Sequence, residues 1–425
     1  MSVRATTGQE RAELRRFGPN HRWTVLGIGV AAQASFSAAI SGLPVTGTSM
    51  RADYLLTTAT LGLVIGAIYL GIAVSEIAWG IWTDRFGERK VLLVGLLSTA
   101  AVLALMAIGV VPSAGATPPT WLLVAGMFLV GVLGGSINGS SGRAVMAWFQ
   151  EGQRGLAMSI RQTAMPAGGA IGIALLPGLA AAYGFRVVYL ILAGLCFLTA
   201  VATFIWLHEP GKTASAGGPA EIASARSPLA RWDIWRLALA SALLTMPQFG
   251  ILTFSAVFLH DAKGAGVLTT VLTLIVVQVG GGAARILSGR YTDKRGNRRR
   301  VIKQFGGAAA VMLLLAAVLV DAPTVLVAAV LAIGGIFANA WHGVAYTEIA
   351  SMAGHAKAGT ALGLENTTVF SMGFITPLLI PLVLGWSGSW MLVWLLIGVA
   401  SALAVPLAPA VLKAARTPAQ AGGSA

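Results

Sequence analysis

Apolar runs long enough to cross a lipid bilayer recur along this whole 425-residue chain, separated by short stretches rich in Arg, Pro and Gly. A membrane-spanning helix needs about 20 mostly apolar residues. Charged residues make up only 10% of the chain, whereas a soluble domain carries about 25%. Hydrophobic residues make up 56%, close to what about twelve such spans require. The sequence therefore predicts an all-α membrane protein with twelve transmembrane helices.

The twelve expected spans divide into two groups of six. They cover residues 24–47, 55–82, 91–111, 121–148, 155–180, 187–207, 234–258, 267–289, 301–320, 324–349, 359–384 and 390–411. Between the groups, residues 208–233 are too polar and too rich in small residues to bury a core, which is typical of a flexible linker. The expected organisation is a tail over 1–22, a six-helix bundle over 23–207, the linker over 208–233, a second bundle over 234–412 and a tail over 413–425.

Lys and Arg are distributed unevenly between the two sides of this topology. With the N-terminus inside, 23 of the 29 basic residues fall on the cytoplasmic side, three on the outer side and three within spans. Cytoplasmic loops carry an excess of Lys and Arg, so we expect both termini in the cytoplasm. The distribution accounts for the net charge of +14 without a nucleic-acid partner, which needs the charge gathered on one folded soluble face. The expected location is the cytoplasmic (inner) membrane of a bacterium.

Two loops at corresponding places in the halves share a motif. Residues 80–90, after the second span, read GIWTDRFGERK, and residues 289–299, after the eighth, read GRYTDKRGNRR. Glycines, an aspartate and a basic pair recur at a constant offset of 209 residues, which indicates a duplicated six-helix unit. The glycine that starts each motif is small enough for close helix approach. Asp84 and Asp293 are expected to cap a neighbouring helix or to pair with the basic residues.

The pattern G-x-x-x-D-R-x-G-x-R-K after the second of twelve spans resembles the loop motif of the major facilitator superfamily, with a weaker copy after the eighth. The resemblance covers essentially the whole chain. It implies two pseudo-symmetric six-helix bundles around a central cavity, transport of a small solute by alternating access, and a gate that stabilises one conformer. The gating residues that it implies are Gly80, Asp84, Arg85, Gly87, Arg89, Lys90 and, in the second loop, Asp293. Glu88 departs from the small or basic residue common at its position.

Four ionisable side chains fall well inside predicted spans: Glu76, Arg161, Arg285 and Glu365. Placing a charged side chain at the centre of a membrane helix costs about 2.5–3.5 kcal/mol, so each of the four is a candidate for function. Glu76 aligns with Arg285 at an offset of 209, and Arg161 with Glu365 at an offset of 204, so each pair related by the repeat has opposite charges. In the superfamily the second span packs near the eleventh and the fifth near the eighth. The resemblance thus implies that the acids lie on one side and the arginines form an electropositive wall on the other.

An arginine among small residues has an open planar fork, which is suited to a carboxylate. Residues 284–293 look like the eighth-span segment of monocarboxylate and oxalate/formate-type carriers, whose arginine contacts substrate. The other interpretation is a structural role, in which the arginines bond to the two glutamates or to backbone carbonyls. The first span carries a polar stripe of Gln33, Ser37 and Ser41 at four-residue spacing, for which helix–helix hydrogen bonding is the alternative role. For His342 in the tenth span, the alternative role is packing. The candidate substrate-binding residues are Arg285, Arg161, Gln33, Gln162, Gln278, Asn366 and His342.

Glu76 and Glu365 are the candidate proton carriers, although burial and a nearby arginine act in opposite directions on a carboxyl group. The leading prediction is a secondary active transporter of a small organic anion, a monocarboxylate, coupled to protons or to a counter-anion. The alternative is a drug or metabolite efflux pump of the same superfamily, for which cavity acids with few opposing arginines are expected.

The sequence contains no metal-ligand spacing, nucleophile constellation or cofactor loop, so neither an enzyme nor a metal or cofactor is expected. The single cysteine, Cys196, excludes an intrachain disulfide. We expect a monomer whose partners are a small solute, protons and the lipid bilayer.

Overall fold

The structure is a computed structural model that describes residues 18, 20–113, 116–209 and 226–410. Within these residues the chain is helical apart from turns, loops and an isolated β-bridge between Ser113 and Ala116. The helices of the first half are α2 (His21–Val45), α3 (Gly47–Asp53), α4 (Thr58–Phe86), α5 (Glu88–Gly109), α6 (Thr120–Trp148) and α7 (Arg154–Trp206). Those of the second half are η1 (Pro228–Ala230), α9 (Trp232–Val257), η2 (Phe258–Ala262), α10 (Val267–Arg295), α11 (Arg298–Val318), α12 (Thr324–Ala340), α13 (His342–Ala353), η3 (His355–Lys357), α14 (Ala358–Ser387) and α15 (Trp390–Leu407).

Eleven helical segments of the described chain are long and apolar enough to cross a membrane. The longest, α7, has 53 residues and contains two crossings, because the backbone leaves the helical conformation at Gly184, with φ of 72°. α12 and α13 together form one crossing, which is interrupted at Trp341. The predicted all-α fold with twelve transmembrane helices is thereby confirmed. The loop expected at 181–186 is replaced by a turn at Gly184, since glycine adopts a positive φ without steric cost.

Part of the predicted domain organisation lies outside the described residues. This applies to residues 1–17 and 19 of the tail predicted over 1–22, to residues 210–225 of the linker, to residues 411–412 of the second bundle and to the tail over 413–425. The described end of the linker contains η1, and α9 begins at Trp232.

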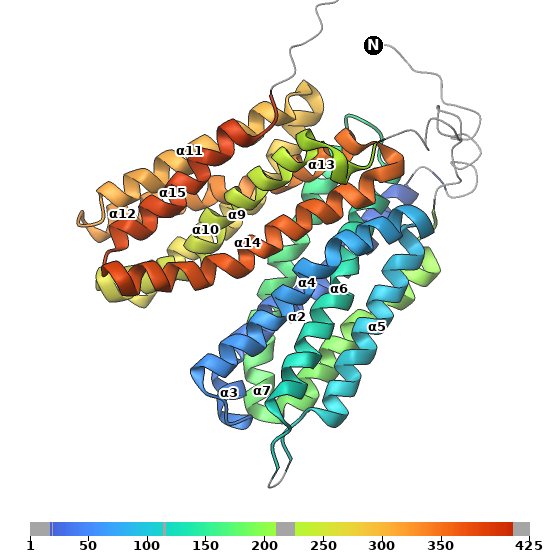
Figure 1. Ribbon diagram of the computed structural model, residues 1–425, viewed down its shortest axis with the longest axis horizontal. Coiled ribbons are helices and arrows are strands. Elements are labelled where there is room, and N and C mark those ends of the chain that lie inside the picture. The colour runs from blue at the N-terminus through green and yellow to red at the C-terminus, as the bar shows by residue number, and fades with distance from the viewer. Residues whose placement is uncertain (1–17, 19, 114–115, 210–225, 411–425) are drawn as a thin grey trace, which may run out of the picture.

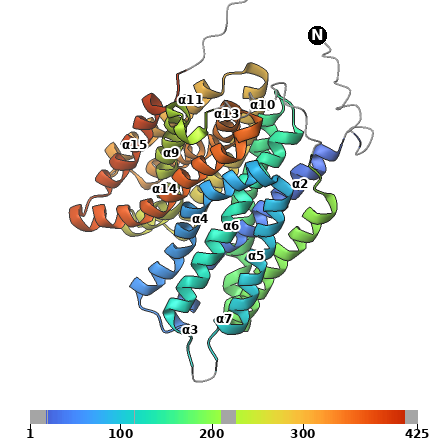
Figure 2. The ribbon, with the colours of Figure 1, turned by 45° about the vertical axis from the view of Figure 1, so that its right-hand side comes forward.

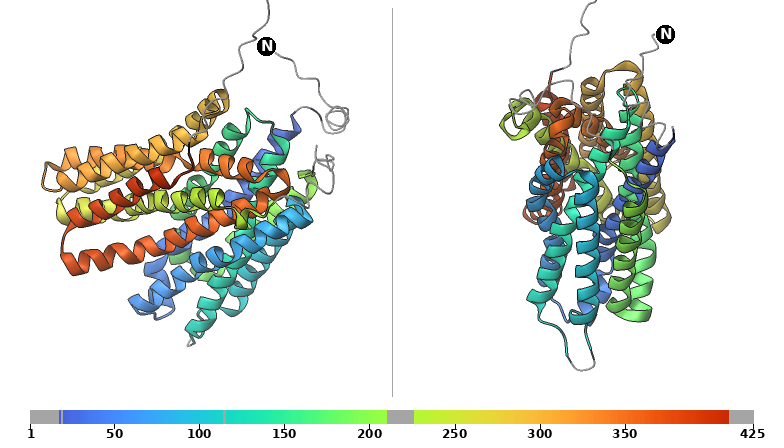
Figure 3. Two further views of the ribbon diagram at one scale, coloured as in Figure 1. Left: turned by 45° about the horizontal axis from the view of Figure 1, so that its top comes forward. Right: turned by 90° about the vertical axis from the view of Figure 1, so that its right-hand side faces the viewer.

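The two halves of the chain form separate helical bundles, which we call the N-bundle (α2–α7) and the C-bundle (α9–α15). In Figure 1 they meet near one end and diverge towards the other, and the left view of Figure 3 shows the same divergence. Figure 2 shows α14 alongside α4 at the junction. α4 packs against α14 and α7 packs against α10, as the resemblance implied. We call the end where α4 and α10 terminate the loop-motif end.

Small residues allow these helix pairs to approach closely at the loop-motif end. A Cβ atom built on Gly80 of α4 would collide with the backbone of Gly359 in α14. The equivalent atom on Gly289 of α10 would collide with the backbone of Gly155 in α7. The glycine of each loop motif is therefore required by contact between the bundles.

Candidate functional site

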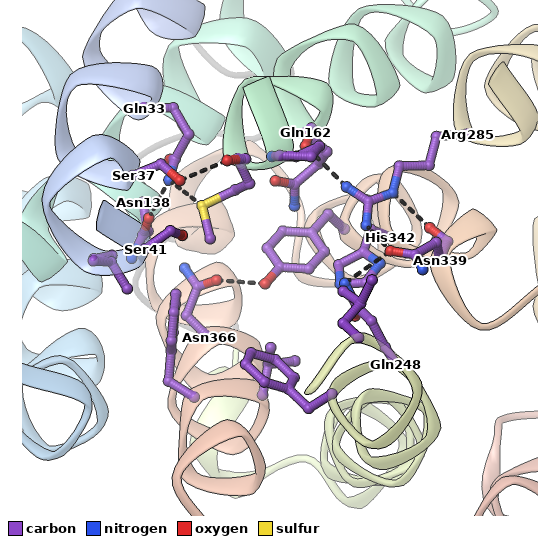
Figure 4. A pocket seen from close by; sticks show the side chains of 18 of the residues that line it. Gln33, Ser37, Ser41, Asn138, Gln162, Gln248, Arg285, Asn339, His342 and Asn366 are labelled. Carbon is purple, nitrogen blue, oxygen red and sulfur yellow. Dashed lines mark hydrogen bonds between the residues drawn. The ribbon is translucent and has the colours of Figure 1, made fainter. Parts of the chain in front are cut away.

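A cavity between the two bundles is lined by polar side chains from both (Figure 4). All seven residues that the sequence predicts for substrate binding line it, and Gln278 is the most exposed of them. The polar lining comprises Gln33, Ser37, Ser41, Asn138, Arg161, Gln162, Gln248, Gln278, Arg285, Asn339, His342, Tyr346 and Asn366. Aromatic rings of Tyr69, Phe249 and Phe370 complete the wall.

Arg161 of α7 is 1% exposed, and neutral groups of the N-bundle accept from its guanidinium. Nη2 donates to Gln33 Oε1 at 2.6 Å, to Ser141 Oγ at 2.7 Å and to the Asn138 carbonyl at 2.5 Å. Nε donates to Ser141 Oγ at 3.1 Å, and Nη1 donates to Gln162 Oε1 at 3.3 Å. These bonds tie the side chain to α2 and α6.

Arg285 of α10 is 3% exposed and lies on the C-bundle side of the cavity (Figure 4). Its Nε donates to the Asn339 carbonyl at 2.5 Å and its Nη2 to Asn339 Oδ1 at 3.1 Å. Its Nη1 donates to the Gln162 carbonyl at 3.0 Å, across the junction between the bundles. The hydrogen bonds to described residues therefore use three of the five N–H donors of this guanidinium.

No ion pair within the described residues joins Arg161 or Arg285 to a carboxylate. The interpretation that these arginines form structural pairs with the two glutamates is therefore wrong, whereas bonds to backbone carbonyls are present. The physical reason is the helix pairing. The acids belong to the α4–α14 pair and the arginines to the α7–α10 pair, so neither arginine meets either glutamate at ion-pair distance, although Arg161 is a charged neighbour of Glu76.

The two buried glutamates have different surroundings. Glu76 of α4 accepts at Oε1 from Asn138 Nδ2 and at Oε2 from Asn366 Nδ2, the latter at 3.1 Å. Because Asn366 belongs to α14, this carboxyl group joins the two bundles. Glu365 accepts at Oε1 from Ser241 Oγ at 2.8 Å, and its Oε2 has no hydrogen-bond partner within the described residues. Both side chains are fully buried, and neither lines the cavity.

Asn339 and Tyr346 line the cavity but were not expected from the sequence. Asn339 accepts from Arg285 and from Gln248 Nε2, the latter at 3.0 Å. The Tyr346 hydroxyl donates to Asn366 Oδ1 at 2.5 Å. His342 lies between them in the sequence and stacks on Trp341 and Tyr346. The three-residue and four-residue spacings that place these polar side chains on one helical face are the signal that could have indicated them.

The two motif aspartates cap helices of the opposite bundle. Asp84, near the end of α4, accepts from the backbone N–H groups of Gly359 and Thr360 at 2.8 and 2.7 Å, in the first turn of α14. Asp293, near the end of α10, accepts from the two corresponding N–H groups of α7 at 2.9 and 2.8 Å. This is the capping expected from the sequence, and both caps join the bundles at the loop-motif end.

Ion pairs surround both caps. Arg143 of α6 pairs with Asp84 at 3.3 Å and with Glu88, which gives a partner to the residue that departs from the family pattern. Beside the second cap, Arg298 of the C-bundle pairs with Glu151 of the N-bundle at 2.5 Å. The two pairs of Arg143 lie within the N-bundle, whereas the Arg298–Glu151 pair and the two caps join the bundles and close the loop-motif end.

The other motif residues lie around the turn between α4 and α5. Gly87 connects these helices with φ of 91°. Arg89 donates to a backbone carbonyl near the end of α7 at 2.6 Å. Arg85 lies over the ring of Phe86, and Lys90 is exposed. No group of three or more metal-ligating side chains occurs within the described ranges.

Comparison with known proteins supports the same fold. The Major Facilitator Superfamily profile matches residues 25–377. The chain is 34% identical over 356 residues to the uncharacterized MFS-type transporter Rv2994 of Mycobacterium tuberculosis, covering 83% of this chain and 77% of that protein. It is 26% identical over 363 residues to the probable sulfoacetate transporter SauU of Cupriavidus necator, covering 80% of this chain and 82% of that protein. The structure of the proton:xylose symporter XylE superposes with a TM-score of 0.73 at 15% identity, covering 92% and 96%.

Proposed function

This chain belongs to the major facilitator superfamily and is a membrane transporter, not an enzyme, and we propose that its solute is a small organic anion, a monocarboxylate in the simplest case. The observation that carries this proposal is a cavity with two buried arginines, neither of which pairs with a carboxylate of the described chain. A buried cation without a counter-charge is costly. A bound anion supplies that charge and removes part of the cost.

Arg285 is the better candidate for direct contact with the anion. Its fork is planar and retains donors that no described residue uses, so it can hold a carboxylate or sulfonate in a bidentate manner. Arg161 is more fully bonded within the N-bundle and contributes mainly positive potential. The name of the relative SauU, a probable sulfoacetate transporter, agrees with an anionic solute.

The second candidate, efflux of an amphipathic or cationic compound, requires acids that face the cavity. Neither Glu76 nor Glu365 is among the residues that line it, whereas both arginines are. The charge of the lining thus favours the anion.

We propose further that Glu76 and Glu365 carry the coupled proton. A carboxylate buried at this depth without an ion-pair partner is expensive, and uptake of a proton removes its charge. A proton carried with a monovalent anion also makes the transported pair neutral. If neither glutamate is required for proton-driven transport, exchange against a counter-anion is the remaining form of coupling.

The closed loop-motif end represents one state of the transport cycle. By the distribution of Lys and Arg, this is the cytoplasmic end, so the state is open towards the outside. In this proposal the caps of Asp84 and Asp293 hold the cytoplasmic side shut and must break when the solute is released inward.

A thermal-shift screen tests the solute class, because a ligand that binds the folded state raises its stability by mass action. Purified protein is heated with acetate, lactate, sulfoacetate or a lipophilic cation. We expect stabilisation by at least one anion in the native protein and loss of that stabilisation in Arg285→Gln. Arg290→Gln is the matched control, since Arg290 is exposed on the same helix and does not line the cavity. Stabilisation by the cation alone would overturn the proposal.

A further inference from the structure

We propose that Asn366 transmits the protonation state of Glu76 to the Tyr346 hydroxyl, which becomes a hydrogen-bond donor to the anion only when Glu76 is protonated. This inference rests on the proposed function and specifies how the proton and the anion are coupled at that site. It concerns a chain of three side chains from α4, α14 and α13.

The hydrogen bonds of this chain all point in one direction. The Tyr346 O–H donates to Asn366 Oδ1 at 2.5 Å, and Asn366 Nδ2 donates to Glu76 Oε2 at 3.1 Å. The other carboxyl oxygen of Glu76 accepts from Asn138 Nδ2. Both oxygens of Glu76 thus face N–H donors, an arrangement that fits a carboxylate, which only accepts hydrogen bonds.

If Glu76 is protonated at Oε2, its O–H faces the N–H of Asn366. Two donors then meet with no acceptor between them. Rotation of the Asn366 amide by half a turn removes this conflict, since Oδ1 then accepts from Glu76 and Nδ2 points to Tyr346. A tyrosine hydroxyl can accept as well as donate, so Tyr346 accommodates the change and its own hydrogen is released. The other route, through Asn138, is costlier because Asn138 Oδ1 already accepts from Gln33 at 2.7 Å, and Gln33 in turn accepts from Arg161.

The released hydrogen points to a place where an anion can use it. Tyr346 and Asn366 both line the cavity, and Figure 4 shows Asn366 on the wall opposite Arg285. The Tyr346 side chain is 3% exposed and lies within electrostatic range of both guanidinium groups. A carboxylate or sulfonate held by Arg285 would therefore meet this hydroxyl, which gains an acceptor in exchange for Asn366.

Among the groups around Glu76, the Asn366 side-chain amide is the one that connects its carboxyl group to the Tyr346 hydroxyl in the cavity. α7 presents Arg161 and α13 presents Tyr346 as charged or titratable neighbours, while α6 and α14 present the two amides. Glu365, the other acid of α14, bonds instead to Ser241 of α9. Because binding free energies are reciprocal, an anion that binds better to protonated Glu76 also favours uptake of the proton. Symport of the two follows.

The test is anion affinity as a function of pH, measured by isothermal titration with acetate, lactate and sulfoacetate between about pH 5 and pH 8. The native protein should bind more tightly at low pH, by about tenfold to a hundredfold, the range for a hydrogen bond to a charged group. Glu76→Gln should bind tightly at every pH, because its amide donates to Asn366 as a protonated acid does. Tyr346→Phe should bind weakly at every pH, and the double variant should bind no better than Tyr346→Phe.

Tyr54→Phe is the matched control, since Tyr54 has a buried, hydrogen-bonded hydroxyl outside the cavity. It should retain the pH dependence of the native protein. If Tyr346→Phe keeps that dependence, or if Glu76→Gln still gains affinity in the double variant, the inference is wrong although the anion proposal stands. If none of the three anions binds the native protein at any pH, the proposed function itself fails.

Discussion

Replacement of Asp84 by Asn should open the loop-motif end of the molecule. Asp84 accepts from two backbone N–H groups and from the Thr360 hydroxyl, all between 2.6 and 2.8 Å, and it pairs with Arg143. Asn keeps the shape but removes the charge and turns an NH₂ group towards one of these donors. Loss of a helix cap costs about 0.5–2 kcal/mol, and each hydrogen bond to a charged group contributes about 1.5–3 kcal/mol.

The bonds to α14 exist only while the bundles touch, whereas the pair with Arg143 lies within the N-bundle. Loss of the bonds to α14 therefore destabilises the closed conformer alone. A change of about 2 kcal/mol corresponds to about 30-fold in its population relative to the conformer that is open at this end. Spin labels at Lys90 and Lys294, both exposed at the loop-motif end of different bundles, should report a longer distance in Asp84→Asn by double electron–electron resonance. Cys196 is replaced by Ser in all of these proteins, so that only the two introduced cysteines are labelled.

Asp233→Asn is the control, because Asp233 pairs with Arg231 within the C-bundle. It should leave the label distance unchanged. An unchanged distance in Asp84→Asn, and also in Asp293→Asn, would refute the reasoning that the caps hold the bundles together.

Three further predictions concern packing, coupling and orientation. Gly80→Val should strongly reduce anion uptake into proteoliposomes, because its side chain collides with α14 in the closed state. Gly62→Val on the same helix is the control and should transport normally, since a Cβ atom built on Gly62 meets no atom within 4 Å. Glu365→Gln should lose accumulation driven by a proton gradient while anion exchange continues; retention of proton-driven accumulation would exclude this residue from coupling. In intact cells, an impermeant maleimide should label a cysteine at Arg186 but not one at Lys294, and the reverse result would overturn the predicted orientation.

The positions of the membrane spans and the caps could be predicted from the sequence because both depend on local or periodic features. Apolar run length locates a span, and the constant offset between the two loops identifies equivalent positions such as Asp84 and Asp293. Such features require no knowledge of how distant helices are rotated. Five of the seven predicted binding residues lie on α7, α10 and α14, whose pairing the superfamily implies, whereas Gln33 of α2 and His342 of α13 were predicted only as polar residues within spans.

The partners of the buried arginines could not be predicted, because they depend on helix rotation. Rise per residue gives the height of Arg161 and Arg285 in the membrane, but the acceptors Gln33 and Asn339 come from spans far away in the sequence. The expected alternative of Arg–Glu pairs failed for this reason. The heights of the arginines and glutamates in the membrane were compatible with ion pairs, but their lateral positions in the bundle were not.

The inverted charges of the repeat explain why the cavity remains positive. In each helix pair that joins the bundles, the second transmembrane helix of one repeat packs against the fifth of the other. These pairs are α4 with α14 and α10 with α7. Had the repeat kept the same charge at equivalent positions, each pair would hold one Glu and one Arg, which could neutralise each other. Inversion instead places Glu76 with Glu365 and Arg161 with Arg285. The caps, which close the molecule in the same way on both sides, kept their aspartates, whereas the positions that set the charge of the cavity diverged.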